Sequence, residues 1–247
     1  MIDMQYFLDT TGTIPAGVGF AQFGGLHIGW LILFVAVTVI NCIWYKKLSD
    51  QGRALWKKVV AILLLLDELF KMAMLAIGGR YTVDYLPLHL CSINIFMILI
   101  HAFKPSKVLG VFLYTVCIPG ALAALLFPSW TALPLGNFMH LHSFTVHILL
   151  ALYPIVLFAA GELVPNLKDL SKCLLLLVII AIPIYGVNLL LDTNFMFLMQ
   201  ADPGNPLLIF EQMWGNHLYG YPVIIAGVIV VLYLPLCIYR KIKKQTI

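Results

Sequence analysis

The sequence predicts an all-α, polytopic membrane protein with seven transmembrane helices, and three observations support this prediction. Of the 247 residues, 62% are hydrophobic and only 11% are charged, whereas a soluble domain usually carries about 25% charged residues. Apolar stretches of about 20 residues, the length that crosses a bilayer as a helix, recur along the chain. Basic residues gather at alternating ends of these stretches. Because the backbone in lipid must satisfy its own hydrogen bonds, each stretch is expected to be helical.

The expected helices follow one another so closely that no soluble domain fits between them, and we expect a single membrane domain over residues 1–247. Several stretches contain proline, which should kink the helices without breaking them, because buried neighbours can satisfy the freed carbonyl groups. The seven helices are expected near residues 26–45, 58–79, 85–103, 107–127, 140–161, 172–191 and 218–239.

The distribution of Lys and Arg predicts the orientation. Of the 15 Lys and Arg residues, all except Lys71 and Arg80 lie in the first-to-second, third-to-fourth and fifth-to-sixth connections or in the C-terminal tail. These segments share one side of the membrane if every helix crosses it. Because cytoplasmic loops carry an excess of basic residues, we expect the N-terminus outside and the C-terminus inside a cell membrane.

Composition also excludes several classes of protein. The five cysteines lie in apolar stretches and are odd in number, which is not typical of a secreted disulfide framework. The net charge of +4 comes from basic residues in loops and the tail, so no nucleic-acid partner is expected. His140 and His142 point in different directions, and His147 lies about 10 Å along the helix from His140. We therefore expect no metal ion and no cofactor.

The second expected helix carries three charged residues, which are expensive inside a membrane. Asp67 and Lys71 are four positions apart and share a face, which predicts a buried ion pair. Glu68 points about 100° away from Asp67. One lysine cannot neutralise two carboxylates, so one carboxylate needs another partner, water or a proton. These charges have either a functional role or only a structural one in holding helices together.

Other polar residues map to the outer half of the expected bundle, while the cytoplasmic half is expected to be almost purely aliphatic. A site is therefore expected to open outward as a polar pocket. Each residue also has a structural interpretation, such as a small core residue for Cys91 or a satisfied hydrogen bond for a histidine. The outer set consists of His89, Cys91, Asn94, His142, His147, Asn188, Asn194, Glu211 and His217.

Three short motifs suggest a family. They are the run Leu86–Cys91, the histidines of the fifth helix, and the run Thr193–Leu198 followed by Pro203. Together they resemble the YwaF family of bacterial integral membrane proteins, which is distantly similar to eukaryotic transmembrane acyltransferases that act on phospholipids. In those enzymes a cysteine beside a Pro-x-His motif is held to carry the acyl group. Here residues 87–89 match Pro-x-His, position 88 is leucine, and the nearest cysteine is Cys91.

The residues and the resemblance favour a lipid or acyl-group transferase or hydrolase, with membrane lipid as its partner. A transporter or receptor-like protein with a relay of Asp, Glu and Lys is an alternative, and a scaffold subunit is another. If the protein is an enzyme, a histidine would be the general base, and a carboxylate would orient that histidine or hold a proton. Cys91 or Ser92 would be the nucleophile. The catalytic candidates are His89, His147, Asp67, Glu68 and Cys91, and the substrate-binding candidates are Asn94, His142, Asn188, Asn194 and Glu211.

The orientation is directly testable. A reporter that works only in the cytoplasm, fused to the C-terminus, should be active, because the tail carries Arg240 and Lys241 on the expected inner side. A fusion that is active only when the reporter lies outside would contradict the predicted orientation.

Overall fold

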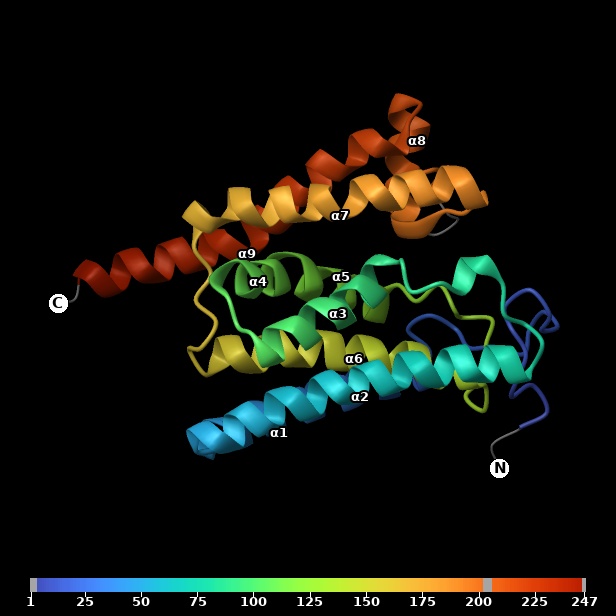
Figure 1. Ribbon diagram of the computed structural model, residues 1–247, viewed down its shortest axis with the longest axis horizontal. Helices are drawn as coiled ribbons and strands as arrows, with labels where there is room; N and C mark the ends of the chain where they lie inside the picture. Colours follow the sequence, from blue (N-terminus) through green and yellow to red (C-terminus); the bar gives the residue numbers. More distant parts are fainter. Residues whose placement is uncertain (1–3, 202–205, 246–247) are drawn as a thin grey trace. The chain divides into compact units, whose positions relative to one another are not determined.

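The computed structural model describes residues 4–201 and 206–245, and within them it contains helices and no strands. The chain divides into two compact units, one ending at Pro165 and the other beginning at Asn166 (Figure 1). The predicted all-α class is confirmed. Each unit is described by itself, beginning with the first, which contains most of the polar side chains that the sequence singled out.

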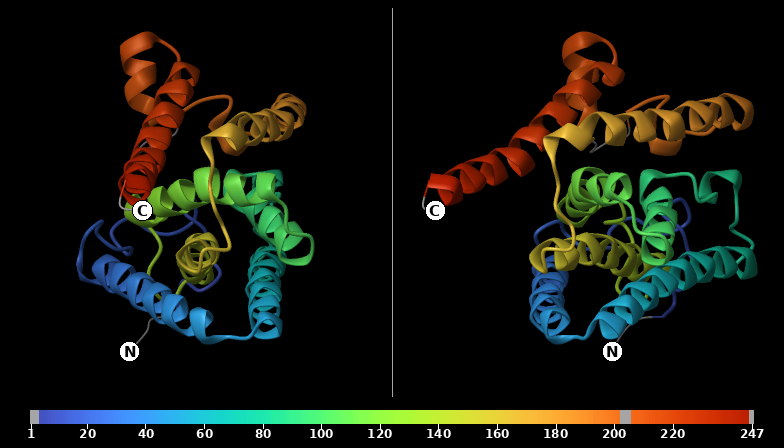
Figure 2. Two further views of the ribbon diagram at one scale, coloured as in Figure 1. Left: turned by 90° about the vertical axis from the view of Figure 1, so that its left-hand side faces the viewer. Right: turned by 60° about the vertical axis from the view of Figure 1, so that its left-hand side comes forward.

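Unit 1 is arranged around one central helix. This helix, α6 (Phe138–Ala159), packs against α1, α2, α3 and α5, and it lies in the middle of the unit (Figure 2). The helix α2 also packs against α3, so α2 has neighbours on two sides. The other elements of unit 1 are α1 (Gly25–Lys47), α2 (Asp50–Ile77), η1 (Val83–Tyr85), α3 (Leu90–Phe103), α4 (Lys107–Phe112), η2 (Leu113–Cys117) and α5 (Ile118–Leu126).

Unit 2 consists of two long helices joined by a folded connection. The buried side chain of Asn188 holds this connection, because its Nδ2 atom donates to the Phe195 carbonyl and its Oδ1 atom accepts from Thr193 and from the Phe195 N–H. The connection includes the short helix α8, which the sequence had indicated only as a loop. The elements are η3 (Leu167–Asp169), α7 (Leu170–Leu191), η4 (Phe195–Phe197), α8 (Leu207–Trp214), η5 (His217–Tyr219) and α9 (Gly220–Gln245).

Within the described residues, six helical segments are long and apolar enough to cross a membrane: Gly25–Lys47, Val83–Phe103, Lys107–Leu126, Phe138–Ala159, Leu167–Leu191 and His217–Ile242. They agree with six of the seven expected helices. The remaining one corresponds to α2, which has 28 residues and begins earlier than expected because Ser49 caps it by accepting from the Gly52 N–H at 3.2 Å. Its charged residues set it apart from the other six, and a total of seven spans stays a prediction.

The prolines behave as expected in three helices and differently in two places. The helices α6, α7 and α9 continue through Pro154, Pro183 and Pro235. Before Pro119, the chain forms the π-helical turn η2, which is consistent with proline removing one donor from the ladder. The expected third helix began too early, because α3 starts at Leu90 and Pro87 precedes it.

The two ends of unit 1 differ in their polar contacts. We call the end where α6 begins the Asn137 end, and the opposite end the Glu162 end. The Glu162 carboxylate accepts from Tyr45 at 2.9 Å and forms ion pairs with Lys57 at 2.9 Å and Arg53 at 3.4 Å. Burial by itself raises the pKa of Glu162, but the hydrogen bonds from Lys57 and Tyr45 and the two cations lower it below its usual range.

The Glu162 end also contains buried polar groups deeper in the unit. His101 Nδ1 lies 3.0 Å from the Tyr153 hydroxyl, and the Trp56 indole donates to Asn41 Oδ1 at 3.0 Å. The expectation that this half is almost purely aliphatic was therefore wrong. The sequence did not reveal these polar groups, because the two partners of each contact are far apart in sequence. None of the four side chains is charged at neutral pH in isolation.

Candidate functional site

The buried lysine of α2 pairs with Glu68. Lys71 Nζ lies 2.5 Å from Glu68 Oε1, and both side chains are almost fully buried. The expected partner was Asp67, which also lies within one turn of Lys71. The expectation of a buried ion pair at this depth holds, but the partner was wrong. Spacings of three and of four residues both place side chains side by side on a helix, so sequence spacing alone could not distinguish the two carboxylates.

The second carboxylate, Asp67, finds its partners on α6. Its Oδ2 atom accepts a hydrogen bond from the Thr145 hydroxyl at 3.0 Å, and its Oδ1 atom lies 3.3 Å from His142 Nδ1. The sequence indicated that one carboxylate needs another partner, water or a proton, and the structure gives Asp67 partners other than Lys71. Thr145 was not predicted. Its spacing of three residues from His142, which places both on one face of α6, was the available signal.

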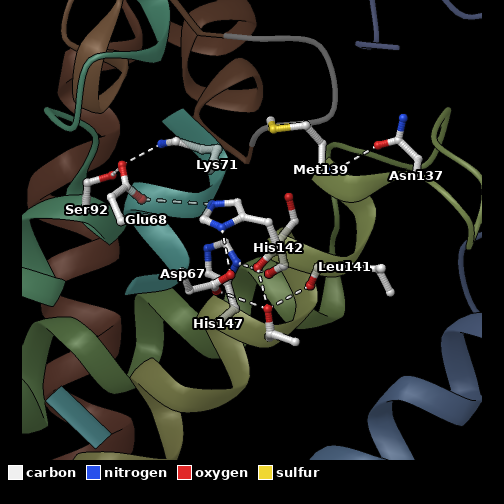
Figure 3. Close-up of polar contacts among 11 residues, drawn as sticks. Asp67, Glu68, Lys71, Ser92, Asn137, Met139, Leu141, His142 and His147 are labelled. Atoms are coloured by element: carbon white, nitrogen blue, oxygen red, sulfur yellow. Dashed lines mark hydrogen bonds and ion pairs between the residues drawn. The ribbon is translucent and has the colours of Figure 1, made fainter. Parts of the chain in front are cut away.

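His142 lies between the two carboxylates (Figure 3). Its Nδ1 atom faces Asp67 at 3.3 Å without hydrogen-bond alignment, and its Nε2 atom lies 3.9 Å from Glu68 Oε2. The sequence placed His142 among the substrate-binding candidates. Its position at the centre of a charged group makes it the histidine best placed to exchange a proton with a carboxylate.

These contacts define a group that we call the acid–histidine cluster, which consists of Asp67, Glu68, Lys71, Ser92, His142 and Thr145. With both carboxylates ionised and Lys71 charged, the net charge is −1 when His142 is neutral. One additional proton brings the net charge to zero. A buried net charge is costly, and His142 lies 3.3 Å and 3.9 Å from the two carboxylates that share the single lysine.

Two potential nucleophiles on α3 border this cluster. The Ser92 hydroxyl donates to Glu68 Oε1 at 3.2 Å (Figure 3). The neighbouring Cys91 thiol lies close enough to Lys71 and Glu68 to interact with both charges, and it contacts Ser92. Cys91 therefore lies within electrostatic range of a carboxylate and a cation at a partly buried position.

The other candidates of unit 1 lie around the cluster in different settings. His147 Nδ1 contacts the Ser143 carbonyl at 2.6 Å, and its ring stacks on Trp130 at 5.3 Å between centroids. Asn94 is buried, and its Oδ1 atom has no hydrogen-bond partner in the described part of the chain. His89 is the residue that precedes α3. That His89 and His147 line one cavity stays a prediction.

Three candidates belong to unit 2. Asn188 organises the connection after α7, and Asn194 holds the next turn by accepting from the Met199 N–H at 3.1 Å. Glu211 lies on α8, and its buried Oε2 atom has no hydrogen-bond partner among the described residues. Pro203, which belonged to the third motif, lies outside the described residues. That these unit 2 side chains share a pocket with the cluster stays a prediction.

The described part of the chain holds no group of three or more His, Cys, Asp or Glu side chains arranged to bind a metal ion. The contacts of Asp67, Glu68 and His142 instead join each acidic group to a proton donor or a cation. Chemically, His142 and the carboxylates can exchange a proton. Glu68 can accept a hydrogen bond from a neighbouring hydroxyl, and the Lys71 ammonium places a positive charge beside that hydroxyl.

Comparison with known proteins places this arrangement within a family. The family model described as the TMEM164 family matches residues 22–239, a range that contains the whole acid–histidine cluster. No curated protein and no solved structure matches the chain. The resemblance to the YwaF family stays a prediction.

The Glu68–Lys71 pair makes a quantitative prediction. Replacing Lys71 with Met should lower the free energy of unfolding by about 3–5 kcal/mol, because Glu68 keeps its charge in a buried site without its cation. The measurement is unfolding of the purified protein in detergent. Lys172→Met, at an exposed position on α7, is the matched control and should change stability by less than about 0.5 kcal/mol.

The double variant Lys71→Met with Glu68→Gln should recover most of the lost stability, because no uncompensated charge is left. Equal stability of Lys71→Met and the unaltered protein would contradict the buried pair.

Proposed function

The chain is a multi-pass membrane protein of the TMEM164 family, and we propose that it transfers acyl groups of membrane lipids through the Cys91 thiol. The observation that carries this proposal is the position of Cys91, which contacts Ser92 and lies within electrostatic range of Glu68 and Lys71, at the edge of a cluster that contains His142. Nucleophile, proton acceptor and cation are the three parts that acyl transfer needs.

In the first step, the thiol of Cys91 loses its proton to the Glu68–His142 pair. The sulfur then attacks the carbonyl carbon of a lipid ester, and the carbonyl oxygen acquires negative charge. The Lys71 ammonium is placed to stabilise this charge electrostatically. The ester C–O bond breaks, the departing alkoxide takes the proton back from the cluster, and the acyl group remains on Cys91 as a thioester.

In the second step, a hydroxyl group attacks the thioester. The cluster accepts the proton of this hydroxyl, a new ester C–O bond forms, the C–S bond breaks, and the thiolate recovers a proton. If the hydroxyl belongs to a second lipid, the reaction is a transfer, and if it belongs to water, the reaction is a hydrolysis. Asp67 acts through His142, because its contact with Nδ1 favours the charged imidazole that forms when the ring takes up a proton.

The environment of this site is also part of the proposal. We place α2 across the membrane as a seventh span, the Asn137 end outward, and the protein in the cell membrane. The basic residues support the orientation, because Lys46, Arg53, Lys57 and Lys58 lie at the Glu162 end of α1 and α2. The Glu68–Lys71 ion pair and the contacts of Asp67 with Thr145 and His142 support the span of α2, since paired charges are tolerated at membrane depth.

A second candidate function rests on the charge balance of the same cluster. His142 lies 3.3 Å from Asp67 and 3.9 Å from Glu68, so the three side chains form a series of neighbouring acidic and basic groups. Such a series is also what a proton-coupled transporter uses. In that case, Cys91 would be a bystander, and proton movement would depend on the carboxylates alone.

The decisive experiment uses the full-length protein in vesicles that contain a phospholipid with an isotope-labelled acyl chain and an unlabelled lysophospholipid as acceptor. We expect labelled acyl groups on the acceptor and a thioester on Cys91, detected as a mass increase that neutral hydroxylamine removes. Cys91→Ala should abolish both signals. His142→Gln should slow transfer by about 10²–10⁴-fold, the usual contribution of general acid–base catalysis.

Cys237→Ala, at an exposed cysteine on α9, is the matched control and should retain full transfer. Transfer that persists in Cys91→Ala would overturn the thioester. Proton flux into the vesicles that requires Glu68 and His142, with no lipid turnover, would favour the relay instead.

A further inference from the structure

The segment before α1, residues 4–24, is folded against the Asn137 end of unit 1. Its backbone and side chains contact positions more than 100 residues away in sequence. The Phe20 N–H donates to the Thr131 carbonyl at 2.8 Å, and Gln22 Nε2 donates to the Leu126 carbonyl at 3.1 Å. The space above Gly19 is filled by the backbone of Thr131 and Ala132, so no other side chain fits at that position.

The segment holds the first turn of α6 through Asn137. This fully buried side chain caps α6, since its Oδ1 atom accepts from the N–H groups of Met139 and His140. Its Nδ2 atom donates to the carbonyls of Tyr6 and Asp9 at 2.7 and 2.8 Å. One amide therefore fixes both the start of α6 and the path of the segment across it.

The segment is also attached to the end of α2. Asp9 Oδ1 lies 3.0 Å from Arg80 Nη2, directly after the last turn of α2. The two side chains are partly exposed, at 22% and 39% of their full accessible surface. Ion pairs of this kind contribute little to stability, so this contact can open without unfolding the helices.

Both attached helix ends lie close to the acid–histidine cluster. His142 lies about 6 Å from the start of α6, and Lys71 lies about 9 Å from the end of α2, at a rise of 1.5 Å per residue. Glu68, Lys71, Ser92 and His142 are all buried. A polar molecule that approaches from the Asn137 end therefore meets residues 4–24 before it reaches the cluster.

We propose that residues 4–24 form a lid over the Asn137 end of the acid–histidine cluster and that the Asp9–Arg80 ion pair is its latch. The lid controls the access of water and polar reactants to Cys91, while lipid chains reach the site from the membrane side. Residues 4–21 precede the range that the family model matches, whereas residues 22–24 and Arg80 lie within it. Of the proposed function, the lid requires only that Cys91 lies beside the acid–histidine cluster, and it does not depend on acyl transfer.

The test measures how fast a charged, water-soluble maleimide labels Cys91 in the purified full-length protein, quantified by peptide mass spectrometry. Asp9→Asn and Arg80→Gln should each raise the rate about two- to fivefold, the range expected from the loss of an exposed ion pair. The double variant should label no faster than either single variant, because both remove the same contact.

Asp84→Asn is the matched control, since Asp84 also follows α2 and accepts a hydrogen bond from its neighbour Thr82 at 3.1 Å. It should leave the rate unchanged. The exchanged pair, Asp9→Arg with Arg80→Asp, should restore slow labelling. Unchanged rates in both latch variants would overturn the proposal, as would an equal rise in Asp84→Asn or an exchanged pair that stays fast. Faster labelling of the fully buried Cys117 would indicate general unfolding and would also contradict a local lid.

Discussion

Two adjacent carboxylates within an otherwise apolar helix constrain the rest of unit 1. Asp67 and Glu68 point about 100° apart on α2, so a single lysine cannot serve both. A buried charge without a partner costs several kcal/mol, and each carboxylate therefore requires a different neighbouring surface. Glu68 meets Lys71 and Ser92, while Asp67 meets Thr145 and His142. This requirement sets both the rotation of α2 and its position between α3 and α6.

The same constraint assembles the chemistry of the site. Because α2 turns one carboxylate toward each neighbour, His142 comes to lie between them, and the start of α3 brings Cys91 to the Glu68–Lys71 pair. Stability and proton chemistry thus depend on the same contacts. The proposed acyl transfer and the proposed proton relay both use these contacts, so the two proposals rest on one arrangement of side chains.

The sequence was informative where the physics is local. Helix positions followed from the length of the apolar stretches, and the shortage of cations predicted that one carboxylate needs another partner, water or a proton. The sequence did not determine which carboxylate pairs with Lys71, since Asp67 and Glu68 both lie within reach of Lys71 along the helix. The roles of Thr145 and His142 depend on how α6 faces α2, and the contacts of Glu162 with Tyr45 and Lys57 join residues more than 100 positions apart. Such contacts come from packing and leave no periodic pattern in the sequence.

A double-mutant cycle between Asp67→Asn and His142→Gln tests most directly that α2 and α6 are joined through these side chains. The free energy of unfolding of both single variants and of the double variant would be measured in detergent. Residues in direct contact should show a coupling energy of about 0.5–3 kcal/mol, whereas Asp67→Asn combined with His101→Gln at the Glu162 end should be additive within about 0.5 kcal/mol. Additive effects of Asp67→Asn and His142→Gln would contradict the contact on which the arrangement of the unit depends.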